Sequence, residues 1–156
     1  MLPPFDARGH LPAGIHAADW TEFTTRFGFS ERRQRLLAGL AAALRSLQEA
    51  GCILAYVDGS FVTAKQEPGD FDACWGIAGV DPDRLDPVLL DFSGGRAAQK
   101  AKYGGELFPA ELPEGRSGRT FLEFFQTDRE TGGTKGIVAI DVQAQDFAAG
   151  SLEDKH

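Results

Sequence analysis

The chain has 156 residues, of which 42% are hydrophobic and 25% charged, a composition typical of a single globular domain. Its net charge of −7 argues against a protein that grips a long nucleic acid by itself, because such binding depends on neutralising many phosphates. No apolar run approaches the roughly 20 residues of a membrane span, and the start of the chain lacks the features of a signal peptide, so we expect a soluble cytoplasmic protein with no membrane partner.

Residues 1–18 are rich in Pro and Gly and show no periodicity. We expect an irregular arm that packs on the body of the protein through Leu2, Phe5 and Ile15. Two helices should follow this arm. Asp19 can cap a helix over residues 20–27, where Glu22 completes a capping-box pattern.

The second helix is longer and begins after Ser30, another residue that can serve as an N-cap. It should cover residues 31–50, because leucines recur at helical spacing along one stripe. These leucines are Leu36, Leu40, Leu44 and Leu47. Gly51 follows, in the position of a left-handed C-terminal cap.

Two strands are predicted next, at Cys52–Val57 and Asp70–Ile77, because both segments are apolar runs with aromatic or β-branched members. The sequence Asp58-Gly59-Ser60 should form the turn after the first strand, and Asp58 is interpreted as a turn acid. Short helical pieces are predicted over residues 61–65, 81–90 and 96–102. We expect Cys52 and Cys74, which fall inside the two strands, to be reduced buried thiols.

The last part of the domain is predicted to hold a loop and a hairpin. Residues 103–118 contain several Gly and Pro and are predicted to be a loop. The apolar runs 120–127 and 135–143 flank Gly132-Gly133 and are predicted to pair as a hairpin. The expected fold is therefore an α/β (α+β) domain over residues 19–149, with a mixed sheet, helices mainly on one face and a frayed tail at 150–156.

Asp70 and Asp72 stand two residues apart in the second predicted strand, so both should point away from the core while Phe71 and Ala73 point into it. Two neighbouring carboxylates repel each other unless a cation lies between them. Oxygen ligands suit a hard divalent ion, and Mg²⁺ is the usual choice where phosphates complete its shell. An ordinary pair of edge-strand acids is the alternative.

Gly59 and Ser60 supply the second half of a possible site. A glycine lets the backbone approach a ligand closely, and the N–H groups at the start of a helical turn can hold an anion. A phosphate cradle beside paired carboxylates is what the transfer of a nucleotidyl group needs.

This pattern resembles the signature of the DNA polymerase β-like nucleotidyltransferase superfamily, which reads here as YVDGS, FVTAKQEPG and DFDACW. The resemblance implies a third carboxylate on a later strand. Asp141 in IVAIDVQ is the choice, and Glu123 in FLEFF is its rival. The chain is also similar to a group of small bacterial proteins without an assigned activity, which share phrases such as GGELFPA.

The resemblance implies that Asp70, Asp72 and Asp141 hold Mg²⁺ (or Mn²⁺) and that Gly59, Ser60 and Lys65 bind the phosphates of a nucleoside triphosphate. Arg96 and Lys100 stand four residues apart, so a helix here would place both on one face, either as a clamp for the triphosphate or as an ordinary solvated basic face. The nucleotidyl group would pass to a hydroxyl of an RNA end, a protein or a small molecule. The chain departs from the family pattern at Ala64-Lys65, where small members carry Arg-Gly, and at Gly69, where they carry Ser.

Two alternatives stay open. The protein could be a weak or inactive member of the superfamily that binds a protein partner in a toxin–antitoxin pair, or a metal-dependent hydrolase of nucleotides with water as the acceptor.

Overall fold

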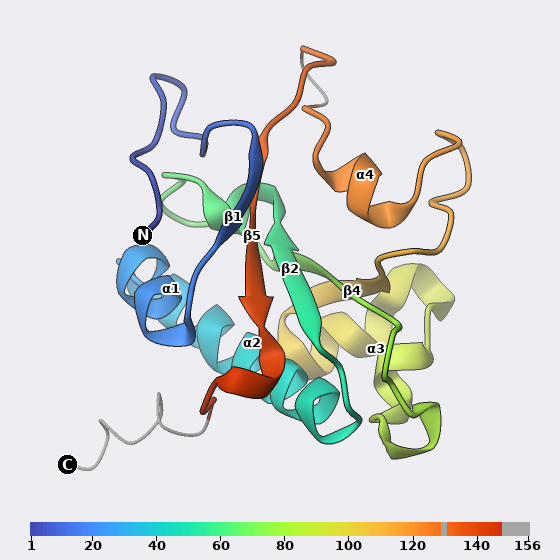
Figure 1. Cartoon of the computed structure of the whole chain (residues 1–156). Coiled ribbons are helices and arrows are strands. Elements are labelled where there is room, and N and C mark those ends of the chain that lie inside the picture. Colours follow the sequence, from blue (N-terminus) through green and yellow to red (C-terminus); the bar gives the residue numbers. More distant parts are fainter. Residues whose placement is uncertain (129–130, 148–156) are drawn as a thin grey trace, which may run out of the picture.

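The structure is a computed structural model that describes residues 1–128 and 131–147 (Figure 1). It contains a five-stranded mixed sheet in the order β1-β5-β2-β3-β4. The strands are β1 (Gly14–Ala17), β2 (Leu54–Asp58), β3 (Phe71–Trp75), β4 (Gly105–Pro109) and β5 (Gly136–Asp141). The α-helices are α1 (Trp20–Phe27), α2 (Glu31–Glu49), α3 (Ser93–Tyr103) and α4 (Phe121–Phe125). The short 3₁₀ helices are η1 (Gly59–Val62), η2 (Pro82–Arg84), η3 (Pro87–Leu90) and η4 (Val142–Ala144). The predicted α+β fold is confirmed.

The helices lie mainly on one face of the sheet, as expected. α1, α2 and α3 cover that face, whereas the short α4 lies on the opposite side (Figure 1). Strand alternation explains the division, since Val57 and Ala73 enter the large core under the helices while Tyr56 and Cys74 point to the other face. A second, smaller apolar cluster forms there beneath α4.

The first two helices begin at the predicted caps. The side chain of Asp19 accepts a hydrogen bond from the backbone N–H of Glu22 at 2.7 Å, and Ser30 Oγ accepts one from Arg33 N at 3.2 Å. The leucine stripe of α2 is buried against the sheet. Local capping and helical periodicity therefore suffice to position both helices.

The N-terminal arm is more ordered than predicted, because β1 joins the edge of the sheet in parallel with β5. Leu2 is buried as expected and Phe5 packs on the core, but Ile15 is 49% exposed, so its predicted packing role is wrong. The four residues of β1 include only one polar side chain, so their sequence shows no alternation of polar and apolar residues that would predict a strand. Their backbone hydrogen bonds to β5 hold them in place.

Two predictions in the last third of the chain are wrong. Residues 120–127 do not form a hairpin strand, because Thr120 caps α4 through a capping box with Glu123. Part of the predicted loop 103–118 is the strand β4, which pairs in parallel with β3. The residues 129–130 of the expected hairpin tip, and the tail at 150–156, lie outside the described residues.

Within residues 1–128 and 131–147, no helix is both long enough and apolar enough to cross a membrane. Cys52 and Cys74 are free thiols and both are buried.

Candidate functional site: a row of carboxylates beside a glycine elbow

Three acidic side chains lie side by side on the face of the sheet away from α1, α2 and α3. Asp58, the last residue of β2, pairs with Asp72 in β3, and Asp72 pairs in turn with Glu106 in β4. Residues in register on neighbouring strands point to the same face, and such strands are about 4.8 Å apart. The fold therefore gathers three carboxylates from three strands, which we call the acid row.

Asp70 lies next to the acid row, two residues before Asp72. Burial raises the pKa of its carboxyl, and the negative charge of Glu106 raises it further, whereas Lys100 and Lys65 oppose the shift. Glu106, Lys100 and Lys65 are thus all within electrostatic reach of Asp70. The predicted pair Asp70 and Asp72 belongs to this cluster.

Asp58 is a member of the buried interior and not the turn acid that the sequence suggested. Its side chain has no exposed surface, and its Oδ1 has no hydrogen-bond partner among the described residues. Its Oδ2 accepts a weak hydrogen bond from Cys74 Sγ at 3.9 Å. Burial, followed by the negative charge of Asp72, raises the pKa of Asp58 well above its usual value, although Lys135 opposes this.

The raised pKa of Asp58 predicts a specific pH dependence of stability. Between its ordinary pKa of 3.8 and the raised value, the folded state binds more protons than the unfolded state, so the free energy of unfolding falls as the pH rises. Asp58→Asn should remove this loss, which can reach about 1.4 kcal/mol per pH unit. Urea unfolding in metal-free buffer at pH 5, 6, 7 and 8 measures it.

The matched control is Asp141→Asn, which changes an exposed acid on β5. This variant should keep the pH slope of the wild type. Parallel slopes for Asp58→Asn and the wild type would show that Asp58 does not hold a proton in the folded state.

Gly59 turns the chain directly after Asp58 and starts η1. Its φ of +75° is a conformation that favours glycine, and a Cβ at this position would lie 2.5 Å from Asp72 Oδ2. The turn therefore needs glycine for two reasons, backbone conformation and the close approach of the acid row. We call Gly59 and Ser60 the elbow.

Arg33 of α2 holds the elbow from the core side, a role that the sequence did not reveal. It has no exposed surface, and its guanidinium lies 4.2 Å from the ring centroid of Phe29 and 4.8 Å from that of Phe61. Its nitrogens donate to the backbone carbonyls of Phe27, Ser60, Phe61, Thr63 and Lys65. Desolvation lowers the pKa of Arg33 to about 10.

Two cations converge on Glu106 at the outer end of the acid row. Arg96 Nη2 lies 3.2 Å and Lys100 Nζ 3.0 Å from Glu106 Oε2. Their spacing of four residues predicted that they would share a helical face, and the structure shows them on one carboxylate oxygen. The site thus combines acids with basic groups that can meet a ligand's negative charge.

The backbone at Arg96 is strained. Gly94, Gly95 and Arg96 have φ values of 58°, 67° and 63°, and Arg96 is the only described residue other than glycine with a positive φ. Such a conformation costs about 1–3 kcal/mol and is typical of functional sites. The Nε of Arg96 is buried and has no hydrogen-bond partner among the described residues.

Asp141 does not belong to this site, and its assignment as the third carboxylate is wrong. It pairs with Leu54, four residues along β2 from Asp58 and thus about 13 Å from the acid row. The reason is that β5 runs antiparallel to β2, which brings the end of β5 to the beginning of β2. The rival, Glu123, is exposed and accepts a hydrogen bond from Thr120 N in the α4 capping box.

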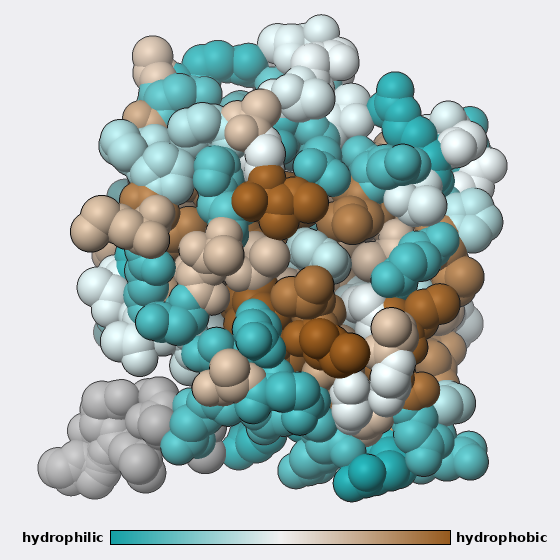
Figure 2. All heavy atoms as spheres, viewed as in Figure 1, coloured by the Kyte–Doolittle hydropathy of each residue, from teal (hydrophilic) through white to brown (hydrophobic). Residues whose placement is uncertain are grey.

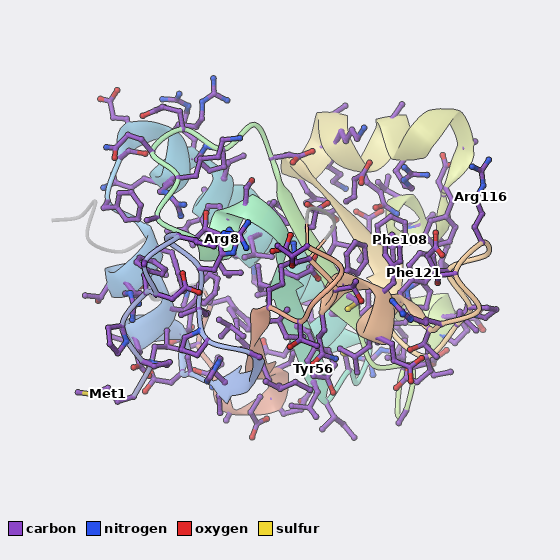
Figure 3. All side chains as sticks on the ribbon, turned by 90° about the horizontal axis from the view of Figure 1, so that it is seen from above. Met1, Arg8, Tyr56, Phe108, Arg116 and Phe121 are labelled. Atoms are coloured by element: carbon purple, nitrogen blue, oxygen red, sulfur yellow. The ribbon has the colours of Figure 1, made fainter. Side chains whose placement is uncertain are left out.

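Two adjoining cavities open on either side of the elbow, and Gly59 and Lys135 line both. The first, of about 510 Å³, also contains Asp72, Glu106, Arg96 and the side chains of Phe108, Phe121, Phe124 and Phe125. The second, of about 520 Å³, contains Arg8, His10, Ser60 and Lys65. Figure 3 shows Phe108 and Phe121 next to each other, with Arg8 well apart from them. Four of the predicted phosphate-binding residues are therefore divided between two neighbouring cavities, and Lys100 lines neither of them.

A family model described as a family of unknown function, DUF6932, matches residues 3–141 of the chain. The chain belongs to the DUF6932 family. The match includes all five strands, the elbow and the acid row. Comparisons with curated proteins and with solved structures found no match.

The side chains of this DUF6932 site suit a hard divalent cation by type, since they offer carboxylate oxygens and a buried oxygen without a partner. Their placement does not form a metal centre: the described residues hold no group of three or more His, Cys, Asp or Glu arranged to bind a metal ion. Glu106 instead binds Arg96 and Lys100. A cation at Asp70, Asp72 and Glu106 would thus require Glu106 to leave one of these partners.

A sequence signal for Glu106 exists in this DUF6932 chain but is weak. The segment GELF has the apolar–acid–apolar pattern, yet it lies between Gly104-Gly105 and Pro109, which predict a loop. Nothing in the local sequence signals the role of Asp58. Asp58 lies next to Asp72 and Cys74 of the neighbouring strand β3, contacts that only the assembled sheet provides.

Proposed function

We propose that this protein is a nucleotidyltransferase, which moves a nucleotidyl group from a nucleoside triphosphate to a hydroxyl. The observation that carries the proposal is the acid row beside the elbow, with Asp72 and Glu106 in register and Asp70 close by. Arg96 and Lys100 add positive charge at the same place. Carboxylates, a glycine turn and cations together can bind phosphates and accept a proton.

The motif resemblance to the DNA polymerase β-like superfamily supports the proposal, with Glu106 in place of Asp141 as the third carboxylate. Glu106 keeps the apolar–acid–apolar pattern and lies on the strand next to Asp72. An RNA end, a protein side chain and a small molecule all carry a suitable hydroxyl. A cytoplasmic location, which two free thiols favour, would supply the nucleoside triphosphate.

Each side chain of the cluster has a role in this reaction. The backbone of Gly59, with Ser60 and Lys65, would hold the phosphates from one side of the elbow, and Arg96 from the other. The acceptor oxygen bonds to the α-phosphorus, the bond from that phosphorus to the bridging oxygen breaks, and pyrophosphate leaves. Glu106 would accept the proton of the acceptor hydroxyl.

With Glu106 released from Arg96 or Lys100, the carboxylates of Asp70, Asp72 and Glu106 could hold Mg²⁺ or Mn²⁺, which would add positive charge beside the phosphates and lower the pKa of the hydroxyl. Asp58, buried behind Asp72, would not contact the ion directly. With its proton it can lie next to Asp72 without adding a second negative charge.

The test combines binding and turnover. Calorimetric titration with ATP and Mg²⁺ should show binding that the double variant Asp70→Ala, Asp72→Ala weakens at least about tenfold, since it removes two charges that hold the ion. Pyrophosphate release that needs a hydroxyl acceptor would support transfer. Release without an acceptor would support the hydrolase alternative, and no binding in the wild type would contradict both.

A second candidate function is favoured by the open face of the sheet. Ile15, Ile53 and Leu54 are 49%, 50% and 38% exposed at β1 and at the start of β2, and Figure 2 shows hydrophobic atoms over the middle of this face. A protein partner, such as the second protein of a toxin–antitoxin pair, could cover them. Co-purification with a neighbouring gene product, lost in Leu54→Lys and without nucleotide turnover, would support this function.

A further inference from the structure

The cavity that contains Asp72 and Glu106 has an aromatic side as well as a charged one. Phe108 lines it and is stacked on Phe121, with ring centroids 4.5 Å apart and planes inclined by 19°. Phe125 lies 5.5 Å from Phe108, and Phe124 stands at 72° to Phe125 at the same centroid distance. Charged and aromatic groups therefore line one and the same cavity.

Core packing explains only part of the aromatic side. α4 has five residues, three of which are phenylalanines, and none of the five is buried. Phe121 and Phe125 contact the small cluster around Phe108, but Phe124 belongs to neither apolar core. Half-buried aromatic side chains that converge on a cavity of about 510 Å³ are typical of a ligand site.

The shape of the ligand follows from the lining. Flat aromatic faces bind a flat ring by stacking, and Arg96, whose guanidinium lies 5.2 Å from the centroid of Phe108, adds a planar cation beside them. The same Arg96, with Lys135 and Gly59, lines the part of the cavity that suits an anion. The cavity thus matches a molecule with a planar ring at one end and negative charge at the other.

We propose that the phenylalanines of this cavity stack on the base of the donor nucleotide, with Phe124 as the side chain that a bound base would cover. This inference rests on the proposed function, because it assigns the base of the same nucleotide whose phosphates meet Arg96 and the elbow. Stacking on phenylalanine tolerates different bases, since every base has a flat face. The site should therefore bind several nucleoside triphosphates with similar affinity.

Three probes separate the base site from the phosphate site: ATP, inorganic tripolyphosphate and adenosine. Phe124→Ala should weaken the binding of ATP and adenosine about five- to a hundredfold, the range expected for loss of one base stack. It should leave tripolyphosphate binding unchanged, because that ligand has no ring. Ile77→Ala is the control, since Ile77 is 43% exposed and does not line the cavity.

The outcomes are distinct. The inference is supported if Phe124→Ala weakens the binding of ATP and adenosine but not that of tripolyphosphate. If the wild type binds adenosine but not tripolyphosphate, and Phe124→Ala abolishes the adenosine binding, the aromatic site is supported and the phosphate site is contradicted. An equal loss of binding for all three ligands in Phe124→Ala, or no change for any of them, would overturn the inference. The proposed function would still stand in that case if the wild type binds tripolyphosphate. Loss of binding to a short single-stranded RNA but not to ATP would overturn the assignment to the donor nucleotide.

Discussion

Glu106→Gln should lower the rate of nucleotidyl transfer about 1,000-fold, whereas Asp141→Asn should leave it within about twofold of the wild type. The physical reason is the register of the sheet, which puts Glu106 next to Asp72 and places Asp141 four residues away along β2. The measurement is pyrophosphate release with a hydroxyl acceptor and saturating ATP. The two substitutions remove the same charge, one from the site and one from outside it.

The affinity for ATP gives this prediction a second readout. Arg96 and Lys100 keep their positive charges when Glu106 becomes Gln, whereas the proposed divalent ion loses one of its three carboxylates, so the binding of ATP should not weaken when it is measured without a divalent ion. A loss of this metal-free ATP binding in Glu106→Gln would indicate that Glu106 has only a structural role. If Asp141→Asn were as inactive as Glu106→Gln, the assignment of Glu106 and not Asp141 to the site would be contradicted.

Arg33→Met should lower the free energy of unfolding by about 3–5 kcal/mol, the largest effect on stability that we expect for a single substitution in this chain. Arg33 is fully buried, and its loss would leave several backbone carbonyls between Ser60 and Lys65 without their hydrogen-bond donor. Methionine keeps much of the aliphatic volume, so the change tests the guanidinium more than the packing. Urea unfolding monitored by circular dichroism measures it.

The neighbouring Arg32 is the matched control. It lies on the same helix turn, is half-exposed, and forms an ion pair with Glu67 at 3.5 Å. Arg32→Met should cost less than about 1 kcal/mol, as is usual for exposed ion pairs. A cost below about 1 kcal/mol for Arg33→Met would show that the hydrogen bonds of Arg33 are replaced by water or by local rearrangement.

The elbow is held from both faces of the sheet. Arg33 fixes the backbone after Gly59 from the core, and the acid row lies against the same glycine from the other face. A partly destabilised Arg33 variant that still folds should therefore also bind ATP more weakly, because the elbow would no longer be held in one conformation.

Several elements could be predicted from local sequence because their causes are local. The caps Asp19 and Ser30 and the leucine stripe of α2 act within a few turns of helix, and both helices begin where these residues predict. The predicted alternation of side chains in β3 is confirmed, since Phe71 and Ala73 are buried in the large core while Asp72 points to the other face.

The predictions that failed depend on which strands become neighbours. β4 reaches β3 only after the crossover that contains α3, and its flanking glycines and proline made the segment resemble a loop. Residues 120–127 have the composition of a strand, but the capping box of Thr120 and Glu123 turns them into α4. Local composition did not decide between these outcomes.

The sequence alone determined the paired acids, the glycine turn beside them and the helices that support both, because these follow from spacing, capping and alternation over short stretches. Only the tertiary structure decided which carboxylates meet. Asp58 and Glu106 join Asp72 while Asp141 does not, since strand order and direction depend on contacts between residues far apart in the chain.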